Sequence, residues 1–153
     1  MRRFLICLLL LGSLSAGFAG EATAGRVIKV LPFFLDLQGR NALSPSLYDR
    51  DAYQAYLRQH ANERSAFRFD VLWKASDNAN AALKLQVEMR GIGQGGMPRQ
   101  AALEQTVPPH FFRHWNSLTL GGKDYKNFGE LVAWRVTLWS GNQMLSEQKS
   151  FLW

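Results

Sequence analysis

Apolar and polar residues alternate with a period of two in three segments of the chain, residues 67–74, 83–90 and 132–138. Successive side chains of a strand point to opposite faces, so each segment predicts a strand with one buried and one solvated face. Residues 75–82 lie between the first two segments and are mostly small or polar. They predict a hairpin loop.

Four further strands complete the pattern. Residues 144–153 follow Gly141-Asn142, whose residue types tolerate positive φ, and predict a strand that returns along residues 132–138. Residues 27–37, 100–107 and 114–120 are strand-like as well. The total is about seven strands.

One segment has helical periodicity instead. Ser46 and Asp49 resemble a capping box, with aspartate where glutamate is usual. The residues that follow at spacings of three and four, and so share one face of a helix, are Tyr53, Tyr56, Leu57 and His60. We therefore expect a single helix of about three turns between the first two strands.

Seven short strands separated by turn signals favour two packed sheets. The predicted fold class is all-β: an antiparallel β-sandwich of about seven strands, with one helical insertion between the first two. The insertion is long, since about 25 residues separate Gln38 from Ser65, and connections of this length are often functional.

Two segments near the end of the sequence carry a resemblance. Residues 129–139 and 148–153 resemble the last two strands of an immunoglobulin-like sandwich. Together with residues 43–48, they are also similar to a group of uncharacterised exported bacterial proteins. The resemblance implies a fold and an exported protein, but no function.

The first residues have the layout of a signal peptide. Arg2 and Arg3 precede an apolar run, which small residues then dilute. Cleavage fits after Ala19 or after Ala24, and we prefer Ala24 because Ala-Thr-Ala matches the small residues required. The predicted division is a signal peptide, residues 1–24, and one domain, residues 25–153. We expect a periplasmic or secreted protein.

The cysteine content and the charge distribution favour some classes of binding partner over others. Cleavage removes Cys7, so the mature chain has no disulfide, and the loss of Arg2, Arg3 and Glu21 lowers the net charge from +6 to +5. Charges of both signs are interspersed, which favours a solvated surface and no nucleic-acid partner. The apolar run is shorter than the roughly 20 residues of a membrane span, so we expect the mature protein not to span a membrane.

Candidate chemistry in the sequence is weak. Residues 91–96 fit the Gly-x-Gly-x-x-Gly fingerprint, but Pro98 and a strand follow where a nucleotide site needs a helix. His110 and His114 lie four apart, which on an extended segment separates them by roughly 13 Å, too far to share one metal ion. No nucleophile motif is present. We expect no cofactor, no metal site and no catalysis.

The functional hypothesis rests on aromatic residues. Tyr53, Tyr56 and His60 can pack on the sheet as a lid, or they can offer a surface to another protein. Trp139 lies on the opposite parity from Trp134 and could stack on a sugar or a partner. We expect a non-catalytic interaction module for another envelope or secreted protein. A carbohydrate-binding module is the first alternative and a small metal-independent hydrolase the second.

Overall fold

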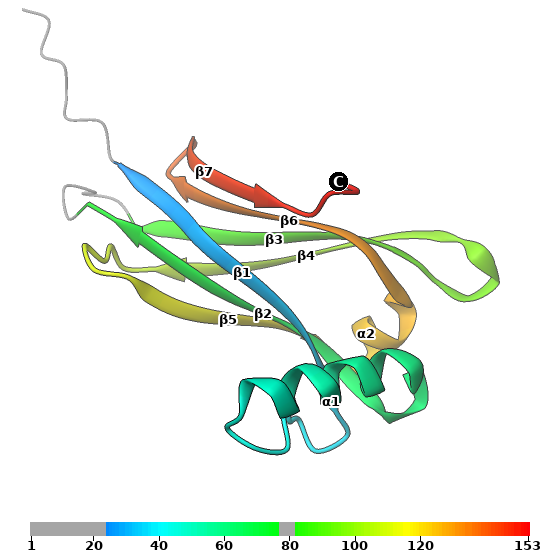
Figure 1. The fold of residues 1–153 in the computed structure, drawn as a ribbon. Helices are drawn as coiled ribbons and strands as arrows, with labels where there is room; N and C mark the ends of the chain where they lie inside the picture. Colours follow the sequence, from blue (N-terminus) through cyan, green and yellow to red (C-terminus); the bar gives the residue numbers. More distant parts are fainter. Residues whose placement is uncertain (1–23, 77–81) are drawn as a thin grey trace, which may run out of the picture.

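The structure is a computed structural model that describes residues 24–76 and 82–153. The predicted signal peptide lies outside the described residues, except for Ala24. Two antiparallel sheets face each other (Figure 1). The first contains β1 (Gly25–Asp36), β2 (Arg64–Ala75) and β5 (His114–Gly121), in that order. The second has the order β4 (Pro98–Val107), β3 (Leu83–Ile92), β6 (Glu130–Ser140) and β7 (Gln143–Lys149). The predicted all-β sandwich is confirmed.

Helical segments lie outside the two sheets. The helix α1 (Leu47–Gln59) and the short 3-10 turn η1 (Ala61–Glu63) connect β1 to β2, so the predicted insertion is confirmed. A second helix, α2 (Gly122–Phe128), joins β5 to β6, and a second 3-10 turn, η2 (Gln94–Gly96), lies between β3 and β4. Within the described residues, no helix is long and apolar enough to cross a membrane.

The predicted hairpin between β2 and β3 is wrong. These strands belong to different sheets, and each already has two neighbours: β2 lies between β1 and β5, and β3 lies between β4 and β6. The connection therefore passes from one sheet to the other, although residues 77–81 themselves lie outside the described residues. In a constant-type immunoglobulin domain, the fourth strand belongs to the same sheet as the first, second and fifth. Here β4 belongs to the other sheet, beside β3.

The last predicted strand is shorter than expected. It ends at Lys149, because Ser150 turns the chain: its N–H donates to the carbonyl of Trp134 at 2.9 Å, and its hydroxyl accepts from the N–H of Trp134 at 3.0 Å. The chain then folds over the outer face of the second sheet. There the guanidinium of Arg90 lies 4.0 Å from the ring centre of Trp153.

The core lies between the sheets and is made by one face of each. On β2 and β3 the predicted apolar parity points inward, and every member of it is buried: Phe67, Phe69, Val71, Trp73, Leu83, Leu85, Val87 and Met89. Trp73 is in the core as predicted, and its indole N–H donates to Asn116 at 2.8 Å. Trp134 packs against the core from a partly buried position.

The helix α1 begins as the sequence predicts, since the hydroxyl of Ser46 accepts from the N–H of Asp49 at 3.3 Å. It packs against the end of β1 with a narrow face (Figure 1). Leu57 is fully buried there, and the amide of Gln54 accepts from the N–H of Phe34 at 2.8 Å and donates to its carbonyl at 3.0 Å.

A single arginine fastens the other end of α1. Arg64, the first residue of β2, is only 7% exposed, and it donates to the carbonyls of Leu57 and Arg58, which have no partner within the helix. Its remaining nitrogen donates to both carboxylate oxygens of Glu130, at 2.8 and 3.0 Å. The guanidinium also lies 4.2 Å from the ring centre of Phe34. One side chain thus joins α1, β1, β2 and β6.

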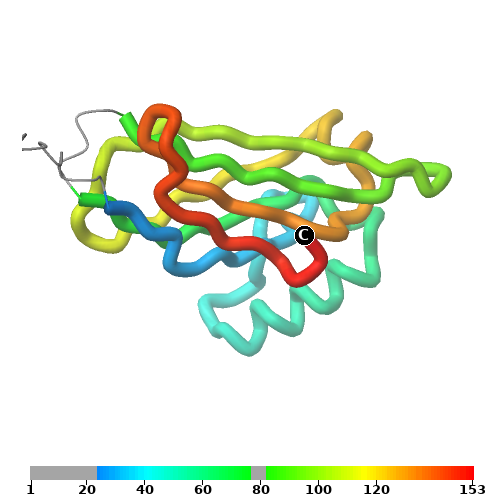
Figure 2. The backbone as a smooth tube through the Cα atoms, turned by 90° about the horizontal axis from the view of Figure 1, so that it is seen from above, coloured from blue at the N-terminus to red at the C-terminus, as the bar shows by residue number. Residues whose placement is uncertain are grey.

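The two sides of the sandwich differ. On one side β1 lies against β7 (Figure 2), where the hydroxyl of Ser146 accepts from the N–H of Val27 at 3.1 Å and the amide of Gln148 donates to the carbonyl of Ile28 at 3.2 Å. We call this contact the seam. On the other side, β4 and β5 each pair with a single neighbour.

Candidate functional site

Three of the residues singled out from the sequence form one row on α1. The rings of Tyr53 and Tyr56 are stacked, with their centres 6.1 Å apart and their planes 7° from parallel. The ring of His60 continues the stack, with its centre 3.9 Å from that of Tyr56. We call Tyr53, Tyr56 and His60 the aromatic row.

Carboxylates orient both phenols of the row. Tyr53 donates to Asp36 at 2.9 Å, and Tyr56 donates to Glu63 at 2.6 Å. Burial and the bond to Asp36 raise the pKa of Tyr53, and the bond to Glu63 followed by burial raises the pKa of Tyr56. Both phenols therefore stay protonated as donors. His60 is oriented in turn by a contact of 2.8 Å between its Nδ1 and the carbonyl of Tyr56.

Asp36 is the anchor beneath the row, and only 2% of it is exposed. Burial alone would raise the pKa of its carboxyl. Hydrogen bonds from the N–H and side chain of Arg40, the hydroxyl of Tyr53 and the N–H of Gln38 outweigh burial, so that the pKa lies below its ordinary value. The ionised form of Asp36 thus stabilises the folded state.

This network predicts a pH dependence of stability. The carboxyl titrates at about 3.9 in the unfolded chain and lower in the folded protein. The stabilising contribution of the charge is therefore fully present above pH of about 4 and is lost as the pH falls through the folded-state value. We expect Asp36→Asn to lower the free energy of unfolding more at pH 7 than at pH 3, as measured by urea unfolding. An equal loss at the two pH values would contradict the role of the charge.

Trp139 does not lie with the aromatic row. It comes at the end of β6 beside the turn to β7, whereas α1 lies at the opposite end of the sandwich (Figure 1). Its ring is half-buried, and its indole N–H donates to the hydroxyl of Thr137 at 2.8 Å. The four candidate residues therefore do not make one surface.

The expected separation of His110 and His114 is wrong. Their rings are stacked with centres 4.1 Å apart, because the chain turns before β5 begins at His114. The edge of Trp73 packs near both rings. Nitrogen lone pairs lie in the ring planes, so nearly parallel rings do not aim them at one ion. Nor does the described part of the chain gather three histidine, cysteine or acidic residues into a possible metal site.

The glycine-rich segment that fits the nucleotide fingerprint has a different role. Gly91 and Ile92 still belong to β3, and η2 then turns the chain into β4, its antiparallel neighbour. Gly95 and Gly96 both have positive φ, which the turn requires. The segment is a hairpin tip and leads into no helix.

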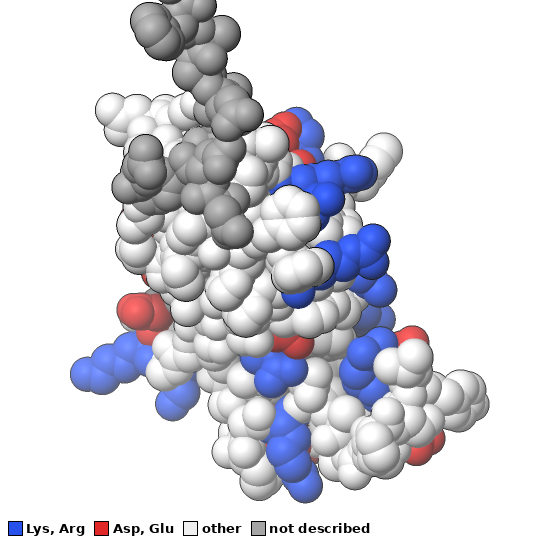
Figure 3. Space-filling view, turned by 90° about the vertical axis from the view of Figure 1, so that its left-hand side faces the viewer, with Lys and Arg blue, Asp and Glu red and all other residues white. Residues whose placement is uncertain are grey.

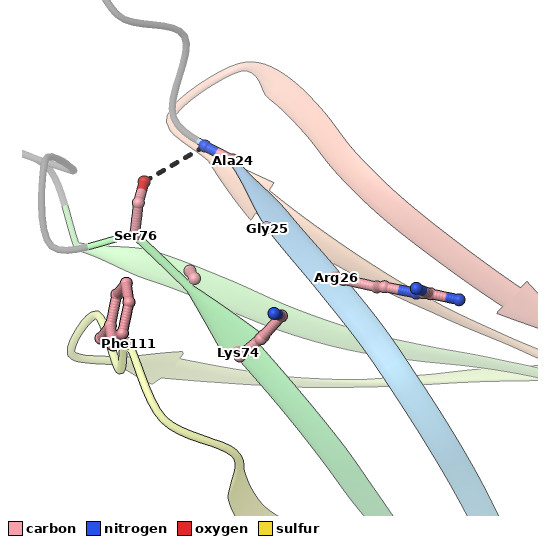
Figure 4. A pocket seen from close by; sticks show the side chains of 7 residues that line it. Ala24, Gly25, Arg26, Lys74, Ser76 and Phe111 are labelled. Carbon is pink, nitrogen blue, oxygen red and sulfur yellow. Dashed lines mark hydrogen bonds between the residues drawn. The ribbon is translucent and has the colours of Figure 1, made fainter.

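A group of exposed aromatic residues, in the loop before β5 and at its start, was missed from the sequence. Phe111 is 63% exposed, Phe112 is 82% exposed and Trp115 is 46% exposed. Phe111 also forms one wall of a pocket of about 200 Å³ beside Lys74 and Ser76 (Figure 4). Seen from this end, the middle of the molecule is largely uncharged, with lysines and arginines along the right-hand side and at the lower margin (Figure 3). Two adjacent phenylalanines that break the alternation were the available signal.

No protein-family model, curated protein or solved structure matches this chain.

Proposed function

We propose that the protein is a non-catalytic interaction module, exported to the periplasm or the medium, which binds another envelope or secreted protein through the aromatic row. One observation carries this proposal: three rings are stacked along α1 and its C-cap, with Tyr56 exposed and Tyr53 and His60 partly buried, and both phenols are held by carboxylates. Such rings lose little conformational freedom when a partner covers them.

The chemistry of the row suits a protein partner. Tyrosine is enriched among the residues that dominate binding energy in protein interfaces, because it combines a large apolar area with a polar group. Tyr56 is 40% exposed and available for such a contact. A protein partner could cover its ring and accept or donate hydrogen bonds at Glu63.

Carbohydrate binding is less well supported by the same geometry. A sugar ring stacks on the free face of an aromatic ring. Both faces of Tyr56, the exposed ring of the aromatic row, are turned toward Tyr53 and His60, so this ring offers a ligand only its edge. This arrangement favours a protein over a sugar.

A photo-cross-linking amino acid in place of Ala55, an exposed residue beside Tyr56, tests the proposal in the native cell envelope. We expect it to capture one abundant protein, and the purified partner to bind the Tyr56→Ala/His60→Ala variant at least about tenfold more weakly. Tyr53 is left unchanged because it holds the buried Asp36. The variant should lose less than about 1 kcal/mol of unfolding free energy, since the bond to Glu63 is exposed.

Two controls separate binding from other effects. The Leu47→Ala/Tyr48→Ala variant removes exposed apolar side chains of the same helix outside the row and should bind normally. A cross-linker in place of Met144, on β7, should not capture the same protein. Equal capture from Ala55 and Met144, or equal affinity of both double variants, would refute the proposal.

A further inference from the structure

Strand β4, the free edge of the second sheet, has several features that allow another strand to pair with it. Strand β4 pairs only with β3, through ten residues and without a register shift. Protein edges are commonly blocked by lysine, by proline within the strand or by a bulge. Here the only proline is Pro98, the first residue, and β4 contains no lysine; its charged residues are Arg99, next to that proline, and Glu104. Between them, Gln100–Leu103 form a regular edge without charge, proline or bulge.

Two hollows adjoin the same short stretch of this edge, Gln100–Ala102. The outer hollow, of about 380 Å³, lies on the solvent face of the sheet against Arg90, Arg135 and Trp153. The inner hollow, of about 330 Å³, lies below the edge. Its lining is mixed: Leu103, Leu120 and Phe128 are apolar, whereas Arg99, Asp124 and Asn127 are polar or charged. The small side chains of β4 leave both spaces open.

The register shows that a new strand would use both hollows. Ala101 pairs with the buried Met89 and thus faces inward, whereas Ala102 pairs with Glu88 and faces outward. A strand added beside β4 would have the same alternation. Its side chains would therefore enter the inner hollow and the outer hollow in turn.

The two hollows differ in the side chains that they favour. One wall of the inner hollow is apolar, at Leu103, Leu120 and Phe128, and an aliphatic side chain that enters it can pack there. In the outer hollow, Arg135 is paired with Glu88 at 2.6 Å, whereas no ion pair among the described residues involves Arg90. Contact with the ring of Trp153 holds the guanidinium of Arg90 beside the hollow. This hollow therefore suits a carboxylate.

We infer that β4 receives an extended segment of a partner protein, in which apolar and acidic side chains alternate. The segment would add a strand to the second sheet, with main-chain hydrogen bonds supplying affinity and the two hollows supplying specificity. The inference goes beyond the proposed function, because β4 and the aromatic row are different surfaces that can be tested separately.

A second copy of the chain is a poorer occupant. Paired antiparallel to itself, β4 would offer Gln100, Ala102 and Glu104 on the outer face. The single carboxylate among them is already bound by Lys84, at 3.3 Å. Self-pairing thus leaves Arg90 without an uncommitted acidic partner.

Labelled peptides of about eight residues, an ordinary strand length, test the inference with the full-length protein. One alternates valine with glutamate, and its matched control alternates valine with lysine. By fluorescence anisotropy, we expect the valine–glutamate peptide to bind at least tenfold more tightly. Hydrogen exchange should show slower exchange of the amides of β4 when that peptide is present.

Variants and modified peptides identify the contacts. Arg90→Glu should weaken binding of the valine–glutamate peptide at least tenfold and strengthen binding of the valine–lysine peptide, whereas Arg26→Glu, with the same change of charge on β1, should change neither. Two further peptides carry methyl groups on every second backbone nitrogen, one on the odd-numbered and one on the even-numbered residues. Only one of these two phases should lose binding, because alternate N–H groups of a strand point to the same edge.

Several outcomes would overturn the inference. These are binding of neither peptide, equal binding of both, loss of binding in both methylation phases or in neither, and an effect of Arg26→Glu as large as that of Arg90→Glu. A concentration-dependent dimer that itself slows exchange on β4 would show that a second copy occupies the edge. None of these results bears on the cross-linking from Ala55.

Discussion

Replacement of Gly129 by alanine is expected to lower the free energy of unfolding by about 2–6 kcal/mol, combining backbone strain and overpacking. Gly129 ends α2 with φ 82° and ψ −140°, near a region that only glycine adopts readily. A Cβ atom at this position would lie 2.2 Å from the carbonyl oxygen of Ile92 and 2.7 Å from the Cα of Gly93. Both contacts are with backbone, which has little room to move.

The matched control for this variant is Gly95→Ala. Gly95 also has positive φ, at 73°, but an added Cβ would meet no atom within 4 Å. Its cost is limited to the left-handed conformation, about 1–2 kcal/mol. Urea unfolding of both variants gives the comparison. A loss at Gly129 no larger than the loss at Gly95 would show that β3 and β6 can separate locally at little cost.

Replacement of Arg64 by methionine is expected to lower the free energy of unfolding by about 2–5 kcal/mol, because two carbonyls at the end of α1 and the carboxylate of Glu130 each lose a charged donor. Methionine keeps much of the side-chain length, so the loss reports hydrogen bonds more than volume. The carbonyl of Arg58 would lose the bond from the guanidinium, the carbonyl of Leu57 would keep only the N–H of His60, at 3.3 Å, and the carboxylate of Glu130 would lose its cation. Lysine should restore little, since its single nitrogen cannot reach acceptors on both sides.

The effect of Arg64 should be greatest on α1. Relative to the unmutated protein, Arg64→Met should accelerate hydrogen exchange of the α1 amides more than exchange of the amides in the central strand β3. Arg50→Met is the control: Arg50 also lies over a ring, 5.1 Å from the centre of Phe33, but its ion pair is with the exposed Asp51. We expect Arg50→Met to lower the free energy of unfolding by no more than about 1 kcal/mol. We call the contacts of Arg64 with α1 and Glu130 the clamp, and similar losses for the two arginines would contradict its role.

Sequence patterns predicted the elements better than their arrangement. The strands could be found because alternation is a local property, and α1 could be found because Ser46 and the helical spacing are local as well. The neighbours of a strand are not local. The inward faces of β2 and β3 read alike whether the two strands pair in one sheet or face each other across the core, so the hairpin was predicted wrongly.

The candidate site shows the same limit. The stacking of Tyr53, Tyr56 and His60 follows from helical spacing, and the sequence placed them on one face. The groups that orient them are partly distant: Asp36 lies 17 residues before Tyr53. The clamp is still less local, since Glu130 lies 66 residues after Arg64. Neither contact has a signal in composition or periodicity.

The prediction that His110 and His114 lie far apart was wrong for a different reason. The predicted separation assumes an extended segment, which the preceding Pro108 and Pro109 favour. The chain instead turns before His114, and the carbonyl of His110 accepts from the N–H of Ala75 at 2.7 Å. A tertiary hydrogen bond to the end of β2 thus decided the conformation of the loop.

The seam between β1 and β7 limits the number of edges at which the second sheet can accept another strand. One edge of that sheet, β7, lies against β1, so among the described strands only β4 can accept another strand there. If a strand is added at β4, as inferred above, the seam leaves the second sheet no other edge of its own for the same addition. Any further strand would have to pair with the added strand itself, so each molecule supplies one acceptor edge in this sheet.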